Sequence, residues 1–484
     1  MTDRMSSLHI ERAQRADQLL ANEQGLSRQL TQRQLGMMAI GSAIGTGLFL
    51  GSALSIRIAG PGVILSYMFA SLVTMALMGC LAEMAVAHPT AGSFGIYAEL
   101  YLSRWAGFTI RYTYWVAVSI SVGSEAVAAA IYTQWWFPQS PMWGWVVFYS
   151  AVLILVNALS VGAFGEFEYW FSMIKVSAIV VFILLGVAVL FGYHQDRPIG
   201  LENFRAYGGF LPNGLRGVWF ALTFVMFSFL GSEVIAVSAG EAKDPERAVP
   251  RAMETMLARL IIFYVGAIAV LVGVIPWTQV QPGHDITVSP FVRVFEIVHI
   301  PAAAHIINFV VLTAALSSMN CNLYLGTRMI FSLARGGYAP PILGHVSQRG
   351  TPFPALLSSA GGLAVALLLA ILLPKAAYVY MFGISLFGAL FAWVLIFATH
   401  LQFRRHTRGQ KIRHFLPLFP LTTIAGAVAV IAILISTWWV QGMRVAIQSG
   451  IPWLVLVTAV YYIWGRKRGV YATARKEANP EAAD

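Results

Sequence analysis

The sequence predicts an all-α polytopic membrane protein with twelve membrane-spanning helices, and three observations support this fold class. Of the 484 residues, 58% are hydrophobic and only 11% are charged, whereas about 25% are charged in an ordinary soluble domain. Apolar runs of about 20 residues, each long enough to cross a hydrocarbon core about 30 Å thick, recur along the whole chain. Lys and Arg residues are concentrated on alternate connections between these runs.

Twelve apolar runs are expected to cross the lipid bilayer. They cover residues 35–57, 61–86, 106–136, 141–163, 168–192, 215–239, 255–276, 301–328, 353–373, 376–401, 415–438 and 446–465. The longest connections, 193–214 and 277–300, are too short for an enzymatic domain and carry no metal-ligand spacing and no set of catalytic residues. Cys80 and Cys321 fall within runs and suggest neither a disulfide nor a metal site. We therefore expect no enzyme, no cofactor and no metal.

The distribution of positive charge predicts the orientation in the membrane. With the N-terminus inside, 24 of the 32 Lys and Arg residues fall on cytoplasmic segments and the helix ends next to them. Because cytoplasmic loops are enriched in Lys and Arg, residues 1–34 and 466–484 are predicted to be cytoplasmic tails. The first tail lacks the apolar stretch and cleavage site of a signal peptide. No soluble module concentrates the net charge of +11, so nucleic acid is not an expected partner.

The first apolar run contains a glycine cluster, "GSAIGTGLFLG", at residues 41–51. Small residues can serve close packing between membrane helices, but Gly45 and Gly47 beside Ser42 and Thr46 favour local unwinding, because glycine weakens a helix. Unwound backbone is tolerated at membrane depth only where it lines a cavity enclosed by protein. We therefore expect a break in this helix, with free N–H and C=O groups that bind a polar ligand.

A second polar interruption follows in the sixth run, where residues 227–233 read "FSFLGSE". Broken helices at matching positions in two halves are typical of transporters built from inverted repeats, and their central site lies between the breaks. Residues 35–192 and 214–401 are accordingly expected to form two inverted five-helix repeats. Residues 415–465 would then add two accessory helices.

Five stretches of the chain share the pattern of a known family. They are "IGSAIGTGLFLGSA", "LAEMAVAHPTAGSFGIYAELYLSRWAGF", "GEFEYWFSMIKVSAI", "FSFLGSEVIAVSAGEAKDPERAVPRA" and "SSMNCNLYLGTRMIFSLA". Together they cover runs one to eight and resemble an amino acid permease of the amino acid–polyamine–organocation superfamily, in the bacterial amino acid transporter branch. The resemblance implies a leucine-transporter-like five-plus-five inverted repeat. It also implies proton-coupled import of amino acids across the bacterial cytoplasmic (inner) membrane.

The two breaks suit the two charges of an amino acid. A helix that restarts exposes N–H groups and partial positive charge, so Gly45, Thr46 and Gly47 are expected to bind the carboxylate. A helix that stops exposes carbonyl groups. The resemblance places the carbonyls that bind the ammonium near Ala43, Phe227 and Leu230. Phe227 also matches the family's aromatic gate over the substrate; the alternative is an ordinary packed aromatic.

Lys175 lies well inside the fifth run. One interpretation is that its side chain snorkels to the cytoplasmic interface, which would strain it at that depth. The resemblance implies another, in which this lysine replaces the cation that holds the first helix against the eighth in sodium-coupled relatives. Its ammonium is then expected to donate to carbonyls near residues 40–43. Ser317 and Ser318 are expected neighbours.

One face of the third run is expected to line the substrate pocket. The positions that follow the spacing of one helical face are Ala117, Val118, Ser121, Val122 and Glu125. By family position this face, with Leu230, forms a largely apolar pocket for neutral substrates. Glu125 then takes up a proton or contacts substrate; the alternative is a hydrogen-bonded glutamate in helix packing.

Three further acidic features lie towards the predicted cytoplasmic side. Glu233 follows the second break and serves gating or proton coupling, or alternatively caps the helix that follows. Glu83 is expected to be an interfacial residue. The segment "AGEAKDPERAVPRA" at 239–252 either holds an inward gate closed through ion pairs or forms a solvated face.

The expected function is secondary active transport: import of α-amino acids with neutral side chains in symport with protons, by alternating access. A rival carrier function is exchange of an amino acid against its decarboxylation product, but the resemblance implies that such exchangers lack a lysine equivalent to Lys175. A γ-amino acid permease of the GABA type is a second alternative. An amino acid sensor without transport is a third, although the terminal tails are too short for a signalling module.

Overall fold

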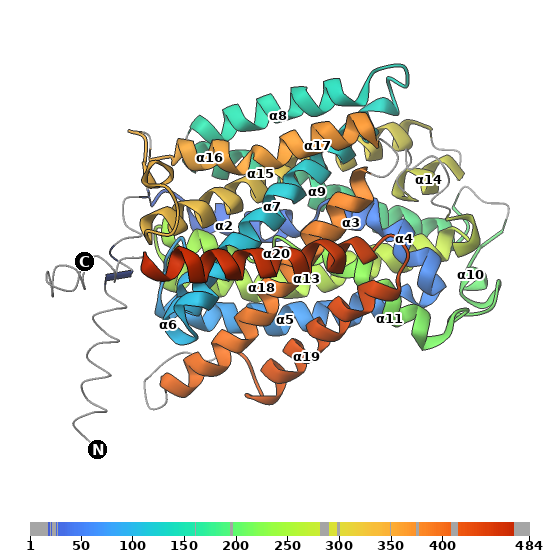
Figure 1. The fold of residues 1–484 in the computed structure, drawn as a ribbon. Coiled ribbons are helices and arrows are strands. Elements are labelled where there is room, and N and C mark those ends of the chain that lie inside the picture. The colour runs from blue at the N-terminus through green and yellow to red at the C-terminus, as the bar shows by residue number, and fades with distance from the viewer. Residues whose placement is uncertain are drawn as a thin grey trace, which may run out of the picture.

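The computed structural model describes residues 28–468 apart from 160, 194–196, 281–289, 298–300, 349, 374–376 and 408–414, together with residues 18, 19, 21 and 26. This part of the chain is helical, and its one β-type pairing is a parallel bridge between Leu30 and Ala242. The long helices lie side by side along a common direction (Figure 1). We name the two ends of the bundle after the short helices found there, the α6 end and the α10 end.

The helices follow one another with short connections. In chain order they are α2 (Gln32–Ala43), α3 (Thr46–Phe49), α4 (Gly51–Ala59), η1 (Gly60–Gly62), α5 (Val63–Ala87), α6 (Ser93–Tyr101), α7 (Arg104–Gln134), α8 (Met142–Leu159), α9 (Val161–Leu190), α10 (Glu202–Arg205), α11 (Gly214–Val225), η2 (Met226–Phe229), α12 (Val234–Ser238), η3 (Ala239–Glu241), α13 (Pro245–Val274), η4 (Trp277–Gln279), α14 (Pro290–Ile297), α15 (Pro301–Arg335), η5 (Pro341–Gly344), α16 (Phe353–Ser359), α17 (Gly361–Leu372), α18 (Ala377–His406), α19 (Leu421–Ser436), η6 (Thr437–Trp439), α20 (Arg444–Ile463) and η7 (Gly465–Lys467).

The all-α membrane fold is confirmed. Within the described residues, nine helical segments are long and apolar enough to cross a membrane, and Met142–Ala158 and Ile261–Val274 are shorter apolar helices. The first predicted run is divided among α2, α3 and α4, and the sixth among α11, η2 and α12. The count of twelve crossings and the inverted repeat stay predictions.

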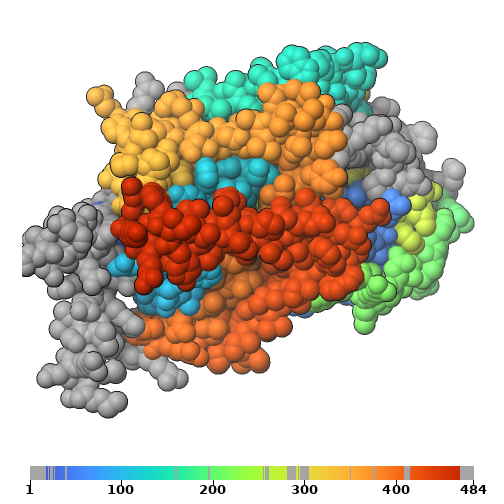
Figure 2. Space-filling view, viewed as in Figure 1, coloured from blue at the N-terminus to red at the C-terminus, as the bar shows by residue number. Residues whose placement is uncertain are grey.

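The bundle has a buried centre and a lipid-facing rim. In the most apolar 18-residue stretch of α7, 89% of the residues are buried inside the protein. In the corresponding stretch of the segment Arg444–Lys467, only 22% are buried. On the face shown in Figure 2, α19 and α20 lie at the surface, and their exposed side chains include Val428 and Val455. Exposed apolar side chains on such helices are expected where the surrounding solvent is hydrocarbon.

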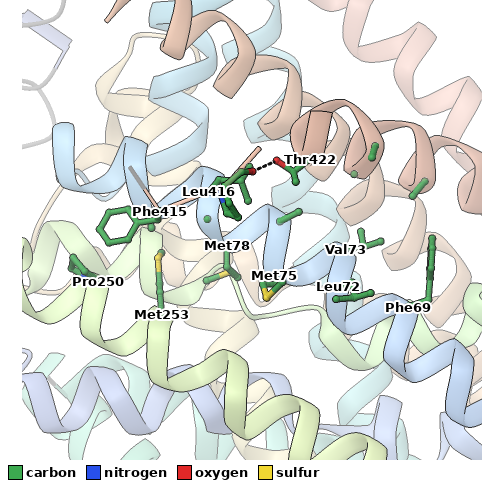
Figure 3. A pocket seen from close by; sticks show the side chains of 17 residues that line it. Phe69, Leu72, Val73, Met75, Met78, Pro250, Met253, Phe415, Leu416 and Thr422 are labelled. Atoms are coloured by element: carbon green, nitrogen blue, oxygen red, sulfur yellow. Dashed lines mark hydrogen bonds between the residues drawn. The ribbon is translucent and has the colours of Figure 1, made fainter. Parts of the chain in front are cut away.

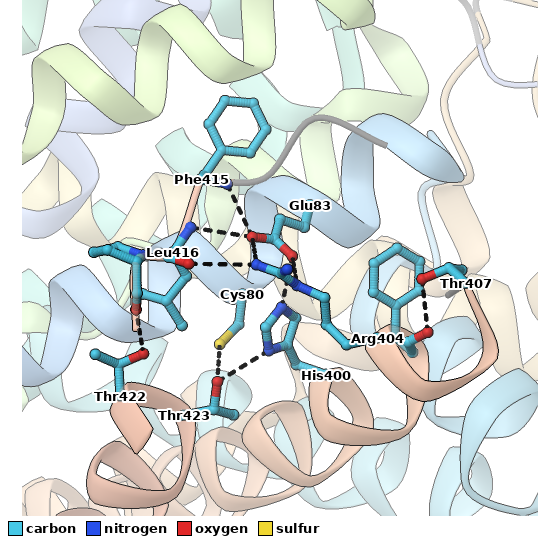
Figure 4. A network of polar contacts seen from close by, with 11 residues as sticks. Cys80, Glu83, His400, Arg404, Thr407, Phe415, Leu416, Thr422 and Thr423 are labelled. Atoms are coloured by element: carbon cyan, nitrogen blue, oxygen red, sulfur yellow. Dashed lines mark hydrogen bonds and ion pairs between the residues drawn. The ribbon is translucent and has the colours of Figure 1, made fainter. Parts of the chain in front are cut away.

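Glu83 is fully buried inside the protein, and its position at the membrane interface stays a prediction. Its carboxylate accepts hydrogen bonds from Arg404 at 2.6 and 2.7 Å and from His400 at 2.8 Å, both on α18 (Figure 4). It also accepts from the backbone N–H groups of Phe415 and Leu416 at 2.9 and 3.0 Å. A buried carboxylate is tolerated only with such partners. Hydrogen bonds of Glu83 therefore link α5 to α18 and to the segment that leads into α19.

An apolar groove of about 610 Å³ lies beside this cluster, between α5, α13 and α19 (Figure 3). Among its lining residues Thr422 has a polar side chain, and its hydroxyl donates to the Pro417 carbonyl at 2.8 Å. Apart from this hydroxyl, the side chains of the described lining residues are apolar, so the groove suits apolar rather than charged molecules. A site for polar molecules has to be sought elsewhere.

We predict that Glu83→Ala lowers the free energy of unfolding by about 3 kcal/mol, because it leaves the buried His400 and the largely buried Arg404 without their acceptor. The matched control is Glu202→Ala, because Glu202 pairs with Arg197 at 3.7 Å where both side chains are more than half exposed. Such surface pairs contribute at most about 1 kcal/mol. Detergent-induced unfolding followed by tryptophan fluorescence measures both, and equal losses would contradict the prediction.

Candidate functional site

The first predicted break lies where expected, between α2 and α3. Gly45 is extended (φ −126°, ψ −160°), and its N–H donates to the Ala43 carbonyl at 3.1 Å. Thr46 and Gly47 then begin a new helical turn, and both are buried. The first N–H groups of a helix have no partner within it. The break therefore presents N–H groups to the protein interior.

The second break lies between η2 and α12. Leu230 is extended (φ −65°, ψ 144°), and Gly231 has a φ of +92°. Glycine adopts this left-handed backbone without steric cost. The Leu230 N–H donates to the Phe227 carbonyl at 3.1 Å, so this carbonyl is engaged within the break.

The two breaks touch each other. A Cβ atom placed on Gly47 would lie 2.7 Å from Cα of Ser228, and one placed on Gly231 would lie 2.9 Å from the Ser42 carbonyl oxygen. Both distances are shorter than real Cβ contacts. The glycines therefore serve both roles that the sequence suggested, because they allow the helices to unwind and the two unwound backbones to meet.

Tyr264 on α13 bridges the two breaks, and nothing in the sequence singled it out. Its hydroxyl lies 2.5 Å from the Ala43 carbonyl oxygen and 2.6 Å from that of Ser228. A hydroxyl has one hydrogen, so it fully satisfies one of these carbonyls at a time. Tyr264 sits in an apolar stretch of the sequence and looks there like any packed aromatic.

Lys175 is fully buried and does not reach an interface. Its ammonium donates to the carbonyl of Gly41, to that of Ile44 at 3.2 Å and to the Ser317 hydroxyl at 2.7 Å. Lys175 thus joins α9 to the carbonyl end of α2 and to α15, as the resemblance implied. Ser318, the other expected neighbour, bonds to Glu125 instead.

Glu125 lies on α7 against the start of α3. Its Oε1 accepts from Ser318 at 2.9 Å, and a Cβ atom on Gly45 would lie 3.4 Å from the same oxygen. Thr46 is also adjacent. The second carboxylate oxygen is buried and has no hydrogen-bond partner of normal geometry. Such an oxygen is costly unless a proton or a ligand satisfies it.

The rest of the predicted α7 face points to other helices. Ser121 accepts a hydrogen bond from Asn322 of α15 at 3.1 Å, and Val118 lies against Gly326 of the same helix. Ala117 instead lines a small cavity of about 130 Å³ with residues of α18 and α20. Glu125 is therefore the member of this face that the structure places at the breaks.

Phe227 and Glu233 both connect the second break to α18. The Phe227 ring stacks on Phe382, with ring centroids 3.9 Å apart and planes 20° apart. Glu233 accepts from the Trp393 indole at 2.6 Å. It is fully buried, and its side chain makes no capping bond to α12. The helix-capping alternative therefore fails for Glu233.

The charged segment after the second break is partly buried. Glu241 pairs with Arg328 of α15 at 2.7 and 3.1 Å, and both are buried. The Leu30 N–H donates to the Glu241 carbonyl at 3.1 Å, and the Lys243 N–H donates to the Leu30 carbonyl at 3.0 Å. Asp244, in contrast, forms only an exposed pair at 3.9 Å. Backbone before the first break is thus joined to backbone after the second.

A solved transporter has a similar architecture. The manganese transporter of Eremococcus coleocola, in complex with an aromatic bis-isothiourea substituted compound, aligns with a TM-score of 0.59 over 90% of this chain and 93% of its own. The sequence identity is 14%, so this likeness concerns the fold alone.

Sequence relatives are closer. An uncharacterized amino acid permease of Bacillus subtilis (strain 168), YtnA, is 39% identical over 91% of this chain and 95% of its own length. The gamma-aminobutyric acid permease of the same organism is 37% identical over 95% and 97%. The aromatic amino acid transport protein AroP of Salmonella typhimurium (strain SL1344) is 36% identical over 90% and 95%.

A family model describes the same relationship across almost the whole chain. The model for amino acid permeases matches residues 34–472, which include both breaks, Lys175 and the helices that carry Glu125 and Tyr264. Its members and the relatives above are transporters rather than enzymes. The chain belongs to the amino acid permease family.

Proposed function

We propose that this protein imports amino acids with neutral side chains, in symport with protons, across the cytoplasmic membrane of a bacterium. The observation that carries the proposal is the contact between the two breaks, with the buried Lys175 ammonium bound to the carbonyl end of α2. The excess of Lys and Arg on one side supports cytoplasmic termini. Alternating access would expose the breaks first to one side and then to the other.

The breaks supply the groups that an amino acid needs. The N–H groups of Thr46 and Gly47 at the start of α3 suit the carboxylate, because a helix N-terminus carries partial positive charge. The carbonyls of Ala43 and Ser228 suit the ammonium, since Tyr264 has one hydrogen for the two. Phe227, stacked on Phe382, is the proposed aromatic gate.

Glu125 is the proposed proton carrier. It lies beside the N-terminus of α3, and its second oxygen has no hydrogen-bond partner of normal geometry. In the proposed cycle this oxygen takes up a proton when substrate binds and releases it on the other side. Lys175 occupies the place that a coupling cation would need, which supports independence from sodium.

A γ-amino acid is the second candidate substrate, and the 37% identity to a gamma-aminobutyric acid permease favours it. The carboxylate and ammonium of such a substrate are farther apart than those of an α-amino acid. It would therefore need carbonyls farther from Gly47, in a site opened more widely between α3 and η2.

We predict that an inward proton gradient drives accumulation of at least one neutral amino acid in proteoliposomes. A protonophore should abolish accumulation, and replacing sodium by choline should leave it unchanged, because Lys175 fills the cation's place. The measurement is uptake of a panel of radiolabelled amino acids. The panel includes gamma-aminobutyric acid, as the second candidate substrate, and ornithine, as an amino acid with a cationic side chain. A strict requirement for sodium would contradict the coupling, and uptake of gamma-aminobutyric acid alone would favour the second candidate.

Gly47→Ala is predicted to weaken substrate binding at least 10-fold. The added methyl group would lie 2.7 Å from the Ser228 backbone, and backbone cannot move aside as a side chain can. Gly45→Ala should cost less, because its nearest neighbour is the Ser318 hydroxyl. Gly36→Ala is the matched control, since no atom lies within 4 Å of its added carbon. Scintillation proximity binding measures all three, and a Gly47→Ala variant that binds like Gly36→Ala would refute the break as the binding site.

Glu125→Gln is predicted to lose proton-driven accumulation more completely than substrate binding, because glutamine keeps the shape of the side chain but does not titrate. Lys175→Ala should impair both together, because α2 loses its link to α9 and α15. Paired binding and uptake assays on the same vesicles separate the two outcomes. If Glu125→Gln still concentrates substrate with the original pH dependence, the proton carrier is another group, and Glu233 is the next to test.

A further inference from the structure

Glu168 is a fully buried carboxylate that the proposed transport cycle does not yet use. It lies on α9 two helical turns before Lys175, so both side chains point from the same side of the helix. The closest approach of the two charged groups is 3.9 Å, between Lys175 Nζ and Glu168 Oε1. Glu168 also lies close to α2, because a Cβ atom added to Gly41 would be 3.2 Å from the same oxygen.

Ser317 connects the two charges. Its hydroxyl accepts a hydrogen bond from Lys175 at 2.7 Å and donates its own hydrogen to Glu168 Oε1. Because a hydroxyl donates one hydrogen and can accept at the same time, this arrangement satisfies all three groups. The hydrogen bonds run in one direction, from the ammonium through the hydroxyl to the carboxylate.

The second oxygen of Glu168 is held from the other side. Asn320 of α15 donates to Oε2 at 3.3 Å, and its own amide oxygen accepts from Asn157 of α8 at 2.6 Å. Ser172 on the next turn of α9 donates to Oε1 at 3.4 Å. The carboxylate is therefore fixed between α8, α9 and α15.

A negative charge is needed at this place. The carbonyls of Gly41 and Ile44 are neutral, so they orient the Lys175 ammonium but do not balance its charge. An unpaired charge in a low-dielectric interior costs several kcal/mol. Within the described part of the chain, the carboxylate that lies within 4.0 Å of Lys175 is that of Glu168.

We propose that Glu168 is a positioning residue that holds the Lys175 ammonium against the carbonyl end of α2. The functional unit is then the pair Lys175–Glu168 with Ser317 between them, and this pair fixes the first broken helix to α15. The inference rests on the proposed transport function only for its second test, and the first test is independent of transport.

The first test is a stability cycle on the full-length protein in detergent. Glu168→Gln and Lys175→Met should each lower the unfolding temperature by about 5 °C, because each leaves one buried charge unbalanced. The double variant should recover at least half of that loss. Glu166→Gln is the control two residues away, since Glu166 is exposed and accepts from Gln34 at 2.9 Å; its shift should stay within about 1 °C.

A double variant no more stable than the worse single variant would overturn the pairing, as would a Glu168→Gln variant as stable as Glu166→Gln. If a single variant cannot be purified, recovery of the folded double variant supports the pair, and its loss overturns it.

The second test measures binding and uptake in the same vesicles. Glu168→Gln should reproduce the effect of Lys175→Ala, with substrate affinity and maximal uptake rate each at least 10-fold lower. The double variant should lose less than twofold more affinity and uptake rate than either single variant, because both changes disrupt the same Lys175–Glu168 pair. Glu168→Asp, which keeps the charge, should restore part of the affinity. Additive losses would show that Glu168 acts apart from Lys175. Absence of amino acid uptake in the unmodified protein would refute the transport proposal and leave the stability cycle intact.

Discussion

The structure depends on how unpaired backbone groups are satisfied where two helices are broken inside a membrane-embedded bundle. In lipid such groups have to be satisfied within the protein, and in this structure side chains of neighbouring helices bind several of them. Lys175 serves the carbonyls of Gly41 and Ile44, and Tyr264 serves those of Ala43 and Ser228. The carbonyl ends of the breaks are therefore held mainly by donors from α9 and α13.

The N–H end of the first break is treated differently. N–H groups are hydrogen-bond donors, so they need acceptors rather than donors such as Lys175 and Tyr264. The acceptor nearby is Glu125, which is adjacent to Thr46; one of its oxygens is bound by Ser318, while the other has no hydrogen bond of normal geometry. A carboxyl group incompletely satisfied at a helix N-terminus is where protonation and ligand binding can compete for the same groups. This asymmetry between the two ends is the physical basis of the proposed coupling.

Local features of the sequence predicted the breaks, because glycine and hydroxyl residues stand out in an apolar run. The resemblance, and not the local sequence, implied that Lys175 would donate to backbone carbonyls near residues 40–43. Local features did not predict Tyr264 or Glu168 as partners, nor the burial of Glu83. Those contacts join segments that are far apart in the chain, and they depend on the rotation of each helix about its axis. Periodicity grouped Ala117 with Glu125, but eight residues at 3.6 per turn leave the two about 80° apart around the helix, and Ala117 faces α18 and α20.

The polar contacts at the α6 end are the ones that the proposed cycle would break. Glu241–Arg328 and the two backbone bonds of Leu30 link the chain before the first break to the chain after the second. Each backbone hydrogen bond contributes only about 1 kcal/mol net, and a buried ion pair gains little over its desolvation cost. Apolar contacts in the centre of the bundle lose far more when separated. In the proposed cycle, the break-bearing helices separate along these polar contacts and keep their apolar packing, because breaking the polar contacts costs less free energy than separating the apolar core.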